Sequence, residues 1–267
     1  MIPRALTIAG SDSGGCAGIQ ADIKTFSALG VFGMSAITAL TSQNTLGVDY
    51  VYPVSVESVS SQIDAVMSDM GADAVKTGML FSKDIIEAVV GRVKYWQIDN
   101  LVVDPVMVSA SGAVLLQDNA VEEMLRYLFP LAKVVTPNLP EAEALAGGKI
   151  KTVSDRKAAC EVIVRKGARS VVLKGGHGNA MDGKAVDLWY NGKAFYELSS
   201  EWIETVNLHG GGCTFSAAIA GYLALSNSLE DSLRQAKKYI GGAILAGKGM
   251  GVGKGDGPVN HFWQTYD

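Results

Sequence analysis

Residues 207–218 read NLHGGGCTFSAA and join three successive glycines to a small, apolar segment with helical spacing. Glycine lets the backbone turn so that successive N–H groups point into one cavity. The first turn of the following helix adds unpaired N–H groups and the positive end of the helix dipole. The stretch therefore predicts a cradle for an anion. A thiol, Cys213, stands at that first turn and is expected to be held partly as thiolate.

A simpler structure fits the same residues. They could form a glycine-rich loop that leads into a packed helix with a buried small residue. Taken alone, the stretch supports both interpretations about equally, so the rest of the chain has to decide between them.

Length and charge narrow the class of protein. At 267 residues the chain forms one large α/β domain or two small ones. A formal net charge of −4 argues against a general nucleic-acid or membrane-surface binder, which needs a basic field. An anionic ligand must then be bound by local donors.

The cysteines and the first residues indicate a cellular compartment. Cys16, Cys160 and Cys213 form no CxxC pair, so neither a disulfide framework nor a zinc knuckle is indicated. Residues 1–6 lack the long apolar run of a signal peptide, and no stretch reaches transmembrane length. We expect a cytoplasmic protein.

Short apolar strands alternate with helical segments along the whole chain. The pattern predicts a mostly parallel sheet with helices on both faces, in one domain over residues 1–267. A late antiparallel hairpin is expected at 186–190 and 193–198, with Asn191-Gly192 as a type I′ turn. The other expected strands are 5–9, 33–40, 74–78, 101–104, 133–136 and 170–173. The expected helices are 19–29, 56–70, 83–95, 119–128, 141–146, 154–166, 214–225 and 229–248.

Polar residues and glycines follow the predicted strands. In parallel sheets, ligands bind outside the carboxyl ends of the strands, so these residues should collect in one site. They are Gly10, Gln43, Gly78, Asp104, Asn138 and Lys174.

Two glycine-rich stretches resemble nucleotide-binding motifs, but each lacks a residue that its motif requires. The loop after the first strand has Ser13 where a G-x-G-x-x-G dinucleotide motif needs its first glycine. Residues 242–248 have Walker A spacing, but Gly249 replaces the Ser or Thr that holds magnesium, and the segment is helical. Neither a Rossmann site nor a P-loop is expected.

Each polar candidate also has a structural interpretation. Asp104 before Pro105 could form an Asx turn, and Asn138 with Glu141 is close to a capping box. Their functional alternative is a site for hydrated magnesium, which takes few carboxylates. Lys174 is by default solvated and contacts phosphate only if a nucleotide site exists. The three scattered histidines predict no metal triad.

Together these pieces resemble the ribokinase-like superfamily of sugar and vitamin kinases. Within it they are most similar to the hydroxymethylpyrimidine/phosphomethylpyrimidine kinases of thiamine synthesis, and the resemblance spans nearly the whole chain in the expected order. The matching segments are LTIAGSDSGG from residue 6, 17–30, 37–44, KTGML at 76–80, DPVM at 104–107, TPNLPEA at 136–142, KGGH at 174–177 and 209–218.

The resemblance implies a three-layer α/β/α kinase that uses ATP and Mg²⁺ and acts as a homodimer. Cys213 stands where most superfamily members carry an aspartate base, behind the anion hole of Gly210, Gly211 and Gly212. The remaining roles also follow from the resemblance alone. Gln43, Asp22, Gly10, Met79 and Val106 would line the pyrimidine pocket, Lys174, Asn138 and Thr214 would contact ATP phosphates, and Glu141 and Asp104 would serve the metal.

The chain departs from the family pattern at a few positions. Such kinases usually read G-T-G-C or G-A-G-C where this chain has Gly211. Cys16 replaces a glycine or other small residue in the first loop, which could be shaped differently. After Met107-Val108 the chain has Ser109, not the cysteine associated with pyridoxal-selective relatives, and no lysine lies between Ser109 and Ser111.

Four functions remain open at this stage. The leading one is an ATP-dependent kinase for the pyrimidine alcohol and then its monophosphate, and the alternative is a pyridoxal/pyridoxine kinase, with or without overlapping activity. A catalytically silent ligand-binding regulator is disfavoured because Cys213, Lys174, Asn138 and Glu141 are intact. A thiol hydrolase is disfavoured because no His–acid partner pattern accompanies Cys213. A small-molecule partner is expected, and neither nucleic acid nor membrane.

Overall fold

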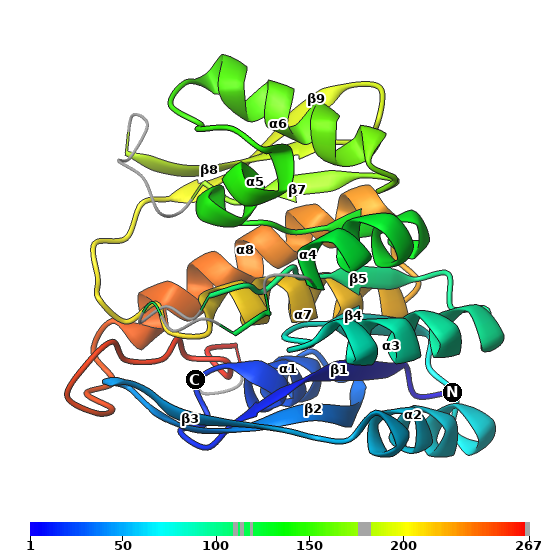
Figure 1. The fold of residues 1–267 in the computed structure, drawn as a ribbon. Helices are drawn as coiled ribbons and strands as arrows, with labels where there is room; N and C mark the ends of the chain where they lie inside the picture. The colour runs from blue at the N-terminus through cyan, green and yellow to red at the C-terminus, as the bar shows by residue number, and fades with distance from the viewer. Residues whose placement is uncertain (109–111, 113–114, 118–119, 176–182, 265–267) are drawn as a thin grey trace.

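The computed structural model describes residues 1–108, 112, 115–117, 120–175 and 183–264. Within them, all strands lie in one sheet of order β3-β2-β1-β4-β5-β6-β7-β8-β9 (Figure 1). The six central strands are parallel, while β3, β8 and β9 are antiparallel to their neighbours. The bounds are β1 Arg4–Asp12, β2 Phe32–Asn44, β3 Gly47–Pro53, β4 Ala74–Thr77, β5 Leu101–Val103, β6 Val134–Val135, β7 Val171–Leu173, β8 Lys184–Tyr190 and β9 Phe195–Glu201.

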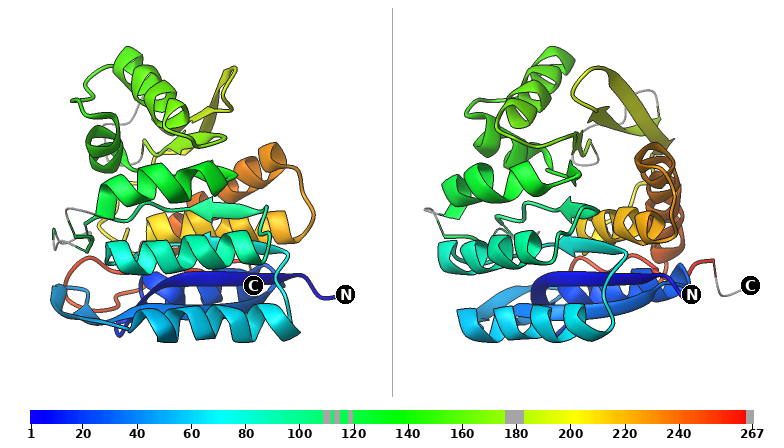
Figure 2. Two further views of the ribbon diagram at one scale, coloured as in Figure 1. Left: turned by 45° about the vertical axis from the view of Figure 1, so that its right-hand side comes forward. Right: turned by 90° about the vertical axis from the view of Figure 1, so that its right-hand side faces the viewer.

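Helices cover both faces of the sheet, which confirms the predicted three-layer α/β/α arrangement (Figure 2). The first layer contains α2 to α6 and the second contains α1, α7 and α8, each packed on its own apolar cluster. The bounds are α1 Gly18–Ala28, α2 Val56–Asp69, α3 Lys83–Tyr95, α4 Ala120–Glu123, α5 Leu139–Ala146, α6 Val153–Arg165, α7 Gly211–Ala224 and α8 Leu229–Gly247.

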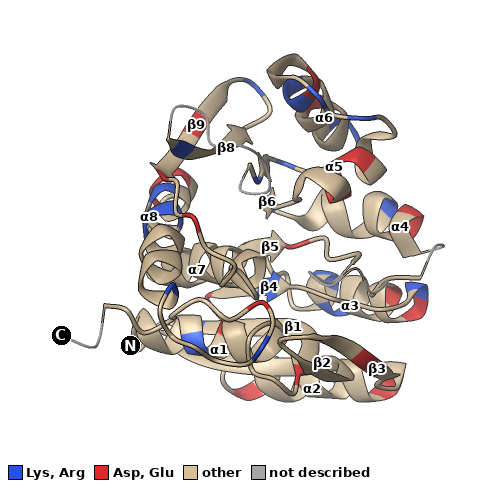
Figure 3. Cartoon of the chain, turned by 90° about the vertical axis from the view of Figure 1, so that its left-hand side faces the viewer, with Lys and Arg blue, Asp and Glu red and all other residues tan. Residues whose placement is uncertain are grey.

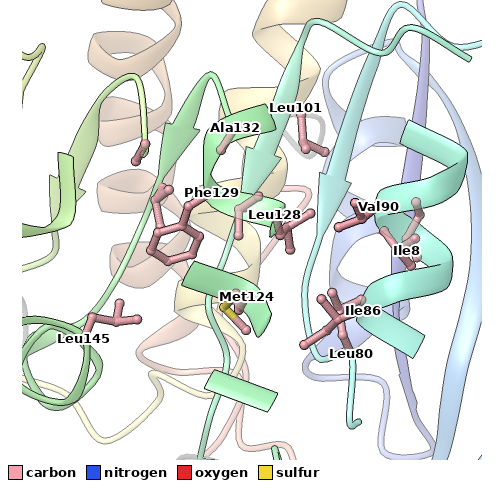
Figure 4. Close-up of a cluster of buried hydrophobic side chains, with 14 of the residues drawn as sticks. Ile8, Leu80, Ile86, Val90, Leu101, Met124, Leu128, Phe129, Ala132 and Leu145 are labelled. Atoms are coloured by element: carbon pink, nitrogen blue, oxygen red, sulfur yellow. The ribbon is translucent and has the colours of Figure 1, made fainter. Parts of the chain in front are cut away.

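The core on the α3 side is built mostly from aliphatic side chains, with buried methionines, Cys160 and Phe129 among them (Figure 4). Ile86 and Val90 of α3 point at the sheet, where Leu101 of β5 is fully buried. Phe129 and Leu128 fill the space beside them without measurable exposure. Burying a side chain of this size contributes about 1.5–3 kcal/mol, so this layer holds the parallel strands, and with them the strand ends, in fixed register.

The structure differs from the predictions at three local points. The edge strand β3 was not predicted, because its residues are mostly exposed and form no apolar run. The segment predicted as a helix over 119–128 is helical over its described residues, but it consists of α4 and a π-helix, η1 (Met124–Leu128). A 3₁₀ turn, η2 (Phe129–Leu131), follows, with Pro130 near its start. The β8–β9 hairpin is confirmed, but Asn191 has no positive φ, which a type I′ turn requires. Its side chain instead accepts the N–H groups of Lys193 and Ala194.

Charged residues of both signs are spread over the outer helices, whereas α7 has none (Figure 3). That helix is buried along most of its length between the sheet, α1 and α8. No helix among the described residues is long and apolar enough to cross a bilayer.

Candidate active site

A cavity of about 650 Å³ opens at the carboxyl ends of the parallel strands, beside the start of α7. It is lined by every residue that the sequence assigned to a site except Gly78, Asp22 and Thr214. Residues far apart in the sequence therefore meet at one edge of the sheet, as the strand-end argument predicted. The predicted residues that line the cavity are Gly10, Gln43, Met79, Asp104, Val106, Asn138, Glu141, Lys174, Gly210, Gly211, Gly212 and Cys213.

The loop at the start of α7 that is predicted to hold an anion leaves fewer free N–H donors than the sequence suggested. The first helical bond runs from Thr214 N–H to the carbonyl of Gly210 at 2.8 Å. Gly211 N–H donates to the carbonyl of Leu208 at 3.0 Å, so it is not available to a ligand. The N–H groups of Gly212 and Cys213 precede the helical ladder and are the donors left for an anion.

Gly210 caps α7 in the left-handed region, with φ of 76°. A Cβ atom placed there would overlap the carbonyl oxygen of Cys16 in the first loop. Cys16 itself is 1% exposed, and its main chain is held by the Asp12 carboxylate, which accepts the N–H groups of Cys16 and Ala17 at 2.8 Å. The first loop and the cradle thus fit against each other, and only glycine fits at 210.

Gly211 needs no such freedom, because its φ is not left-handed and a Cβ atom there would meet only Ile240 and Val259, at 4.0 Å. We expect Gly211→Ala to raise the free energy of unfolding by about 0.4–1 kcal/mol, since alanine reduces the freedom of the unfolded chain. Urea unfolding measures this effect. Gly210→Ala serves as the matched control and should destabilise the protein. A loss of stability in Gly211→Ala would contradict the open space beside this residue.

Lys174 follows β7 and places its ammonium between the cradle and a carboxylate. Its Nζ lies 2.9 Å from Oδ1 of Asp104 and 3.3 Å from the position of a Cβ atom on Gly212. Asp104 is 2% exposed and also accepts hydrogen bonds from Thr136 and from Ser216 of α7. An anion at the N–H groups of Gly212 and Cys213 would therefore also contact the Lys174 cation.

The pair Asn138 and Glu141 forms the capping box of α5, as the structural interpretation predicted. Glu141 accepts the Asn138 N–H at 2.7 Å, and its burial raises the pKa of this carboxyl to about 7. The charge of Asp104 adds to that rise, while Lys174 opposes it.

A magnesium ion fits this pair of carboxylates only in hydrated form. Among the described residues, no group of three or more His, Cys, Asp or Glu side chains could cage a metal ion. Asp104 and Glu141 are two adjacent carboxylates at the cavity wall, and magnesium commonly binds through one or two carboxylates together with waters and phosphate oxygens.

Cys213 faces the cavity but is not the activated thiolate that the helix start suggested. Burial raises the pKa of the Cys213 thiol to about 11, and the charges of Asp22 and Asp104 act in the same direction. Lys76 and the backbone N–H of Gly18 favour the thiolate, and they are outweighed. The local argument failed because it considered only the helix start, and neither the burial of the thiol, which is the main cause of the raised pKa, nor the two carboxylates.

The raised pKa predicts how the rate of alkylation of Cys213 depends on pH. Because the pKa is raised, the thiol is protonated at neutral pH, and each added pH unit below 11 should increase the thiolate about tenfold. We expect the rate of carbamidomethylation of Cys213 by iodoacetamide to rise about tenfold per unit between pH 7 and 9, as followed by peptide mass. A plateau of the rate below pH 8 would contradict the raised pKa.

Asp22 does not line the cavity. It is fully buried on α1, where both carboxylate oxygens accept from Lys76 Nζ at 2.8 and 2.9 Å and Oδ2 also accepts from the Thr7 hydroxyl at 2.6 Å. Lys76 of β4 is itself fully buried and borders the cavity floor. Asp22 therefore does not contact the cavity and instead fixes the position of Lys76, which does.

The hydroxyl of Thr214 does not face the cavity either. The residue is fully buried, and Oγ1 lies 3.1 Å from Nε2 of His261. Burial lowers the pKa of His261 to about 4, so the imidazole is neutral. The Thr214 hydroxyl is therefore turned toward His261 and away from the cavity, and a phosphate contact of this residue stays a prediction.

Gln43 also lines the cavity, as do the apolar side chains of Met79 and Val106. Its Nε2 lies 2.7 Å from Nε2 of His209, and its Oε1 accepts from Thr41 at 3.2 Å. Sequence reasoning missed His209, although the residue directly precedes the predicted cradle.

The cavity also extends between β8, β9 and α8. This part is lined by residues that the sequence did not indicate. Lys237 of α8 and Asp187 of β8 form an ion pair at 2.8 Å, and Asp187 also accepts the N–H of Gly175 at 2.8 Å. The available signal was a carboxylate within the apolar run of β8. The remaining predicted features, Ser109, Ser111 and His177, lie outside the described residues.

An α/β/α sheet with an anion cradle, a lysine and two carboxylates at the carboxyl ends of its strands defines a ribokinase-like small-molecule kinase. The family model described as phosphomethylpyrimidine kinase matches residues 12–260. The chain belongs to this family.

Relatives with known names agree with this assignment. The hydroxymethylpyrimidine/phosphomethylpyrimidine kinase of Bacillus subtilis is 48% identical over 261 residues, covering 98% of this chain and 95% of the relative. A solved phosphomethylpyrimidine kinase from Clostridium difficile is 46% identical, with a TM-score of 0.78 over 90% of this chain and 98% of that one. A solved ADP complex of Bacillus subtilis pyridoxal kinase is 39% identical, with a TM-score of 0.91 over 100% of both chains.

Proposed function

We propose that this chain is an ATP-dependent kinase that phosphorylates 4-amino-5-hydroxymethyl-2-methylpyrimidine and then its monophosphate, giving the pyrophosphate used in thiamine synthesis. One observation carries the proposal. A single cavity joins the amide of Gln43 to the thiol of Cys213 and the Lys174 cation. A flat ring held at Gln43 would direct its hydroxymethyl group toward Cys213 and the cradle.

The names of the relatives support the pyrimidine over pyridoxal. The Bacillus subtilis and Rhizobium meliloti proteins named hydroxymethylpyrimidine/phosphomethylpyrimidine kinase are 48% and 49% identical to this chain. The similar pyridoxal kinase is 39% identical. The amide of Gln43 offers a donor and an acceptor side by side, which matches an aminopyrimidine edge.

The chain's own residues perform the transfer mainly by positioning and by charge. The N–H groups of Gly212 and Cys213 receive the equatorial oxygens of the transferred phosphoryl group, and Lys174 reaches the same group from the β7 side. Because phosphoryl transfer passes through a loose transition state, the alcohol loses its proton late. The Cys213 sulfur accepts that proton in the small fraction of molecules in which it is thiolate, since its raised pKa keeps most of the thiol protonated at neutral pH.

Asp104 and Glu141, with Asn138 beside them, would hold the hydrated Mg²⁺ that accompanies ATP. When bound, the ion neutralises charge on the nucleotide phosphates. The pair Lys237 and Asp187 borders the extension in which the rest of the nucleotide would lie.

The site also bears on the domain organisation of the chain. It takes residues from β1 at one end of the chain and from α7 and α8 at the other, so we infer that residues 1–267 work as one kinase domain. We further infer a homodimer from the family resemblance, and light scattering of the purified protein tests it: a mass of one chain would contradict it.

The two-step reaction is tested by product identification. With ATP, Mg²⁺ and the pyrimidine alcohol, mass spectrometry should detect the monophosphate first and then the pyrophosphate, with no other protein present. A reaction that stops at the monophosphate, even when purified monophosphate is supplied, would contradict the second step and leave the first standing.

A further inference from the structure

We infer that Asp187 is a positioning residue for the proposed transfer: its carboxylate fixes the main chain that follows β7 and thereby aims Lys174 at the phosphoryl group. The inference rests on the proposed function, in which Lys174 contacts that group. It starts from one hydrogen bond, which the N–H of Gly175 donates to Oδ1 of Asp187 at 2.8 Å. Gly175 is the residue directly after Lys174.

This hydrogen bond lies where the backbone pairing of β7 with β8 ends. The last paired residues are Leu173 and Leu188. Beyond them, the Asp187 side chain takes the place of a backbone acceptor for the N–H of Gly175. A Cβ atom on Gly175 would overlap the carbonyl oxygen of Val186, so only glycine fits here. Two adjacent residues of β8 therefore set the position of Gly175, one by close packing and one by a hydrogen bond.

The main chain around Lys174 is held on both sides. The N–H of Lys174 donates to the carbonyl of Pro137 at 2.9 Å, and the next N–H along the chain donates to Asp187. The Lys174 side chain is 12% exposed, and its Nζ lies 2.9 Å from Oδ1 of Asp104. Because a lysine ammonium is carried on a flexible stem, its position depends on how firmly the main chain is anchored. Without the Asp187 bond, the Lys174 ammonium would be free to move away from the cradle.

Lys237 of α8 makes it possible to bury a carboxylate at this place. Both residues are buried, and Nζ of Lys237 lies 2.8 Å from Oδ2 of Asp187. An unpaired carboxylate here would be costly to bury and would repel the phosphates of a nucleotide in the same cavity. The two oxygens thus have separate roles. Oδ1 positions Gly175 as an acceptor, and the negative charge is needed for the pairing with Lys237.

A matched pair of double variants separates the acceptor from the charge. Lys237→Met with Asp187→Asn removes both charges and keeps an oxygen that can accept the Gly175 N–H. Lys237→Met with Asp187→Leu places the same number of side-chain atoms there and has no acceptor. Because both contain Lys237→Met, any contact of Lys237 with the nucleotide is lost equally in the two proteins.

The readout is single-turnover formation of the pyrimidine monophosphate at saturating ATP and Mg²⁺, followed by mass spectrometry. We expect the leucine variant to react about tenfold or more slowly than the asparagine variant, since a displacement of about 1 Å in a catalytic site can cost about 10²-fold. The Kd for the pyrimidine alcohol, measured by calorimetry without nucleotide, should be the same in both. If the leucine variant does not fold, Asp187→Ala with Lys237→Met removes the acceptor without added bulk and should show the same loss.

The same pair in a Lys174→Met background distinguishes positioning from a general structural effect. If Asp187 acts through Lys174, the two double variants react at the same rate in that background. Equal rates with Lys174 present, or an unchanged ratio of rates without it, would overturn the inference alone. A weaker Kd for the alcohol in the leucine variant would also overturn it, because the disturbance would then extend beyond Lys174. A wild-type protein that forms no pyrimidine monophosphate would overturn the proposed function as well.

Discussion

Replacing Cys213 with alanine is expected to lower kcat for phosphorylation of the pyrimidine alcohol about 10²–10⁴-fold, the usual contribution of a positioned acid or base. The sulfur is the proton acceptor proposed at the cradle, and alanine leaves the N–H groups of the first turn of α7 in place. Binding of the alcohol and the KM for ATP should therefore change little. Steady-state kinetics with calorimetry measures all three quantities.

The chain supplies its own control for this experiment. Cys160 is a fully buried thiol on α6 and packs in the core on the other face of the sheet. Cys160→Ala should leave kcat within about twofold. Full activity in Cys213→Ala would remove the base assignment while leaving the kinase assignment standing. Wild-type kcat should also rise with pH above neutrality, since the raised pKa keeps most of Cys213 protonated there.

The second large effect is expected at the buried pair Asp22 and Lys76, both without measurable exposure. Lys76→Met leaves the carboxylate without its cation, which should lower the free energy of unfolding by about 3–5 kcal/mol. Urea unfolding measures this change. In the variant the pKa of Asp22 in the folded state lies above its unfolded value. The loss should therefore be larger at pH 8 than at pH 4, where the folded protein can hold the carboxyl neutral.

Two further variants test the origin of that loss. Asp22→Asn combined with Lys76→Met removes both charges and should recover a large part of the stability. The exposed pair Arg234 and Glu230 on α8 is the matched surface case, and Arg234→Met should cost about 1 kcal/mol or less. A loss of similar size for the buried and the exposed cation would contradict the account of the Asp22 and Lys76 pair.

Most of the fold could be predicted because strand and helix signals alternate regularly. The helix α3 was predicted with its observed bounds, since Ser82 caps it and its apolar residues recur at helical spacing. The edge strand β3 could not be predicted in this way. Its position depends on pairing with β2, and its exposed residues carry no periodic apolar signal.

The site could be predicted where it depends on topology and not where it depends on packing. Asp104 follows β5 and Lys174 follows β7, which are two strands apart in the same parallel sheet, so the strand order brings their side chains together. Asp22 was misplaced because it lies on the buried face of α1, three residues after Ile19 and four before Phe26. That spacing was the available signal. The raised pKa of Cys213 could not be predicted, because it depends first on the burial of the thiol in the folded chain and then on carboxylates from distant segments.

The central claim is that this cavity phosphorylates a pyrimidine alcohol. The most direct measurement is ADP release in a coupled assay, run in parallel with hydroxymethylpyrimidine, its monophosphate and pyridoxal. The account predicts turnover of both pyrimidines, with kcat/KM for the alcohol above that for pyridoxal. Turnover of pyridoxal alone would contradict it.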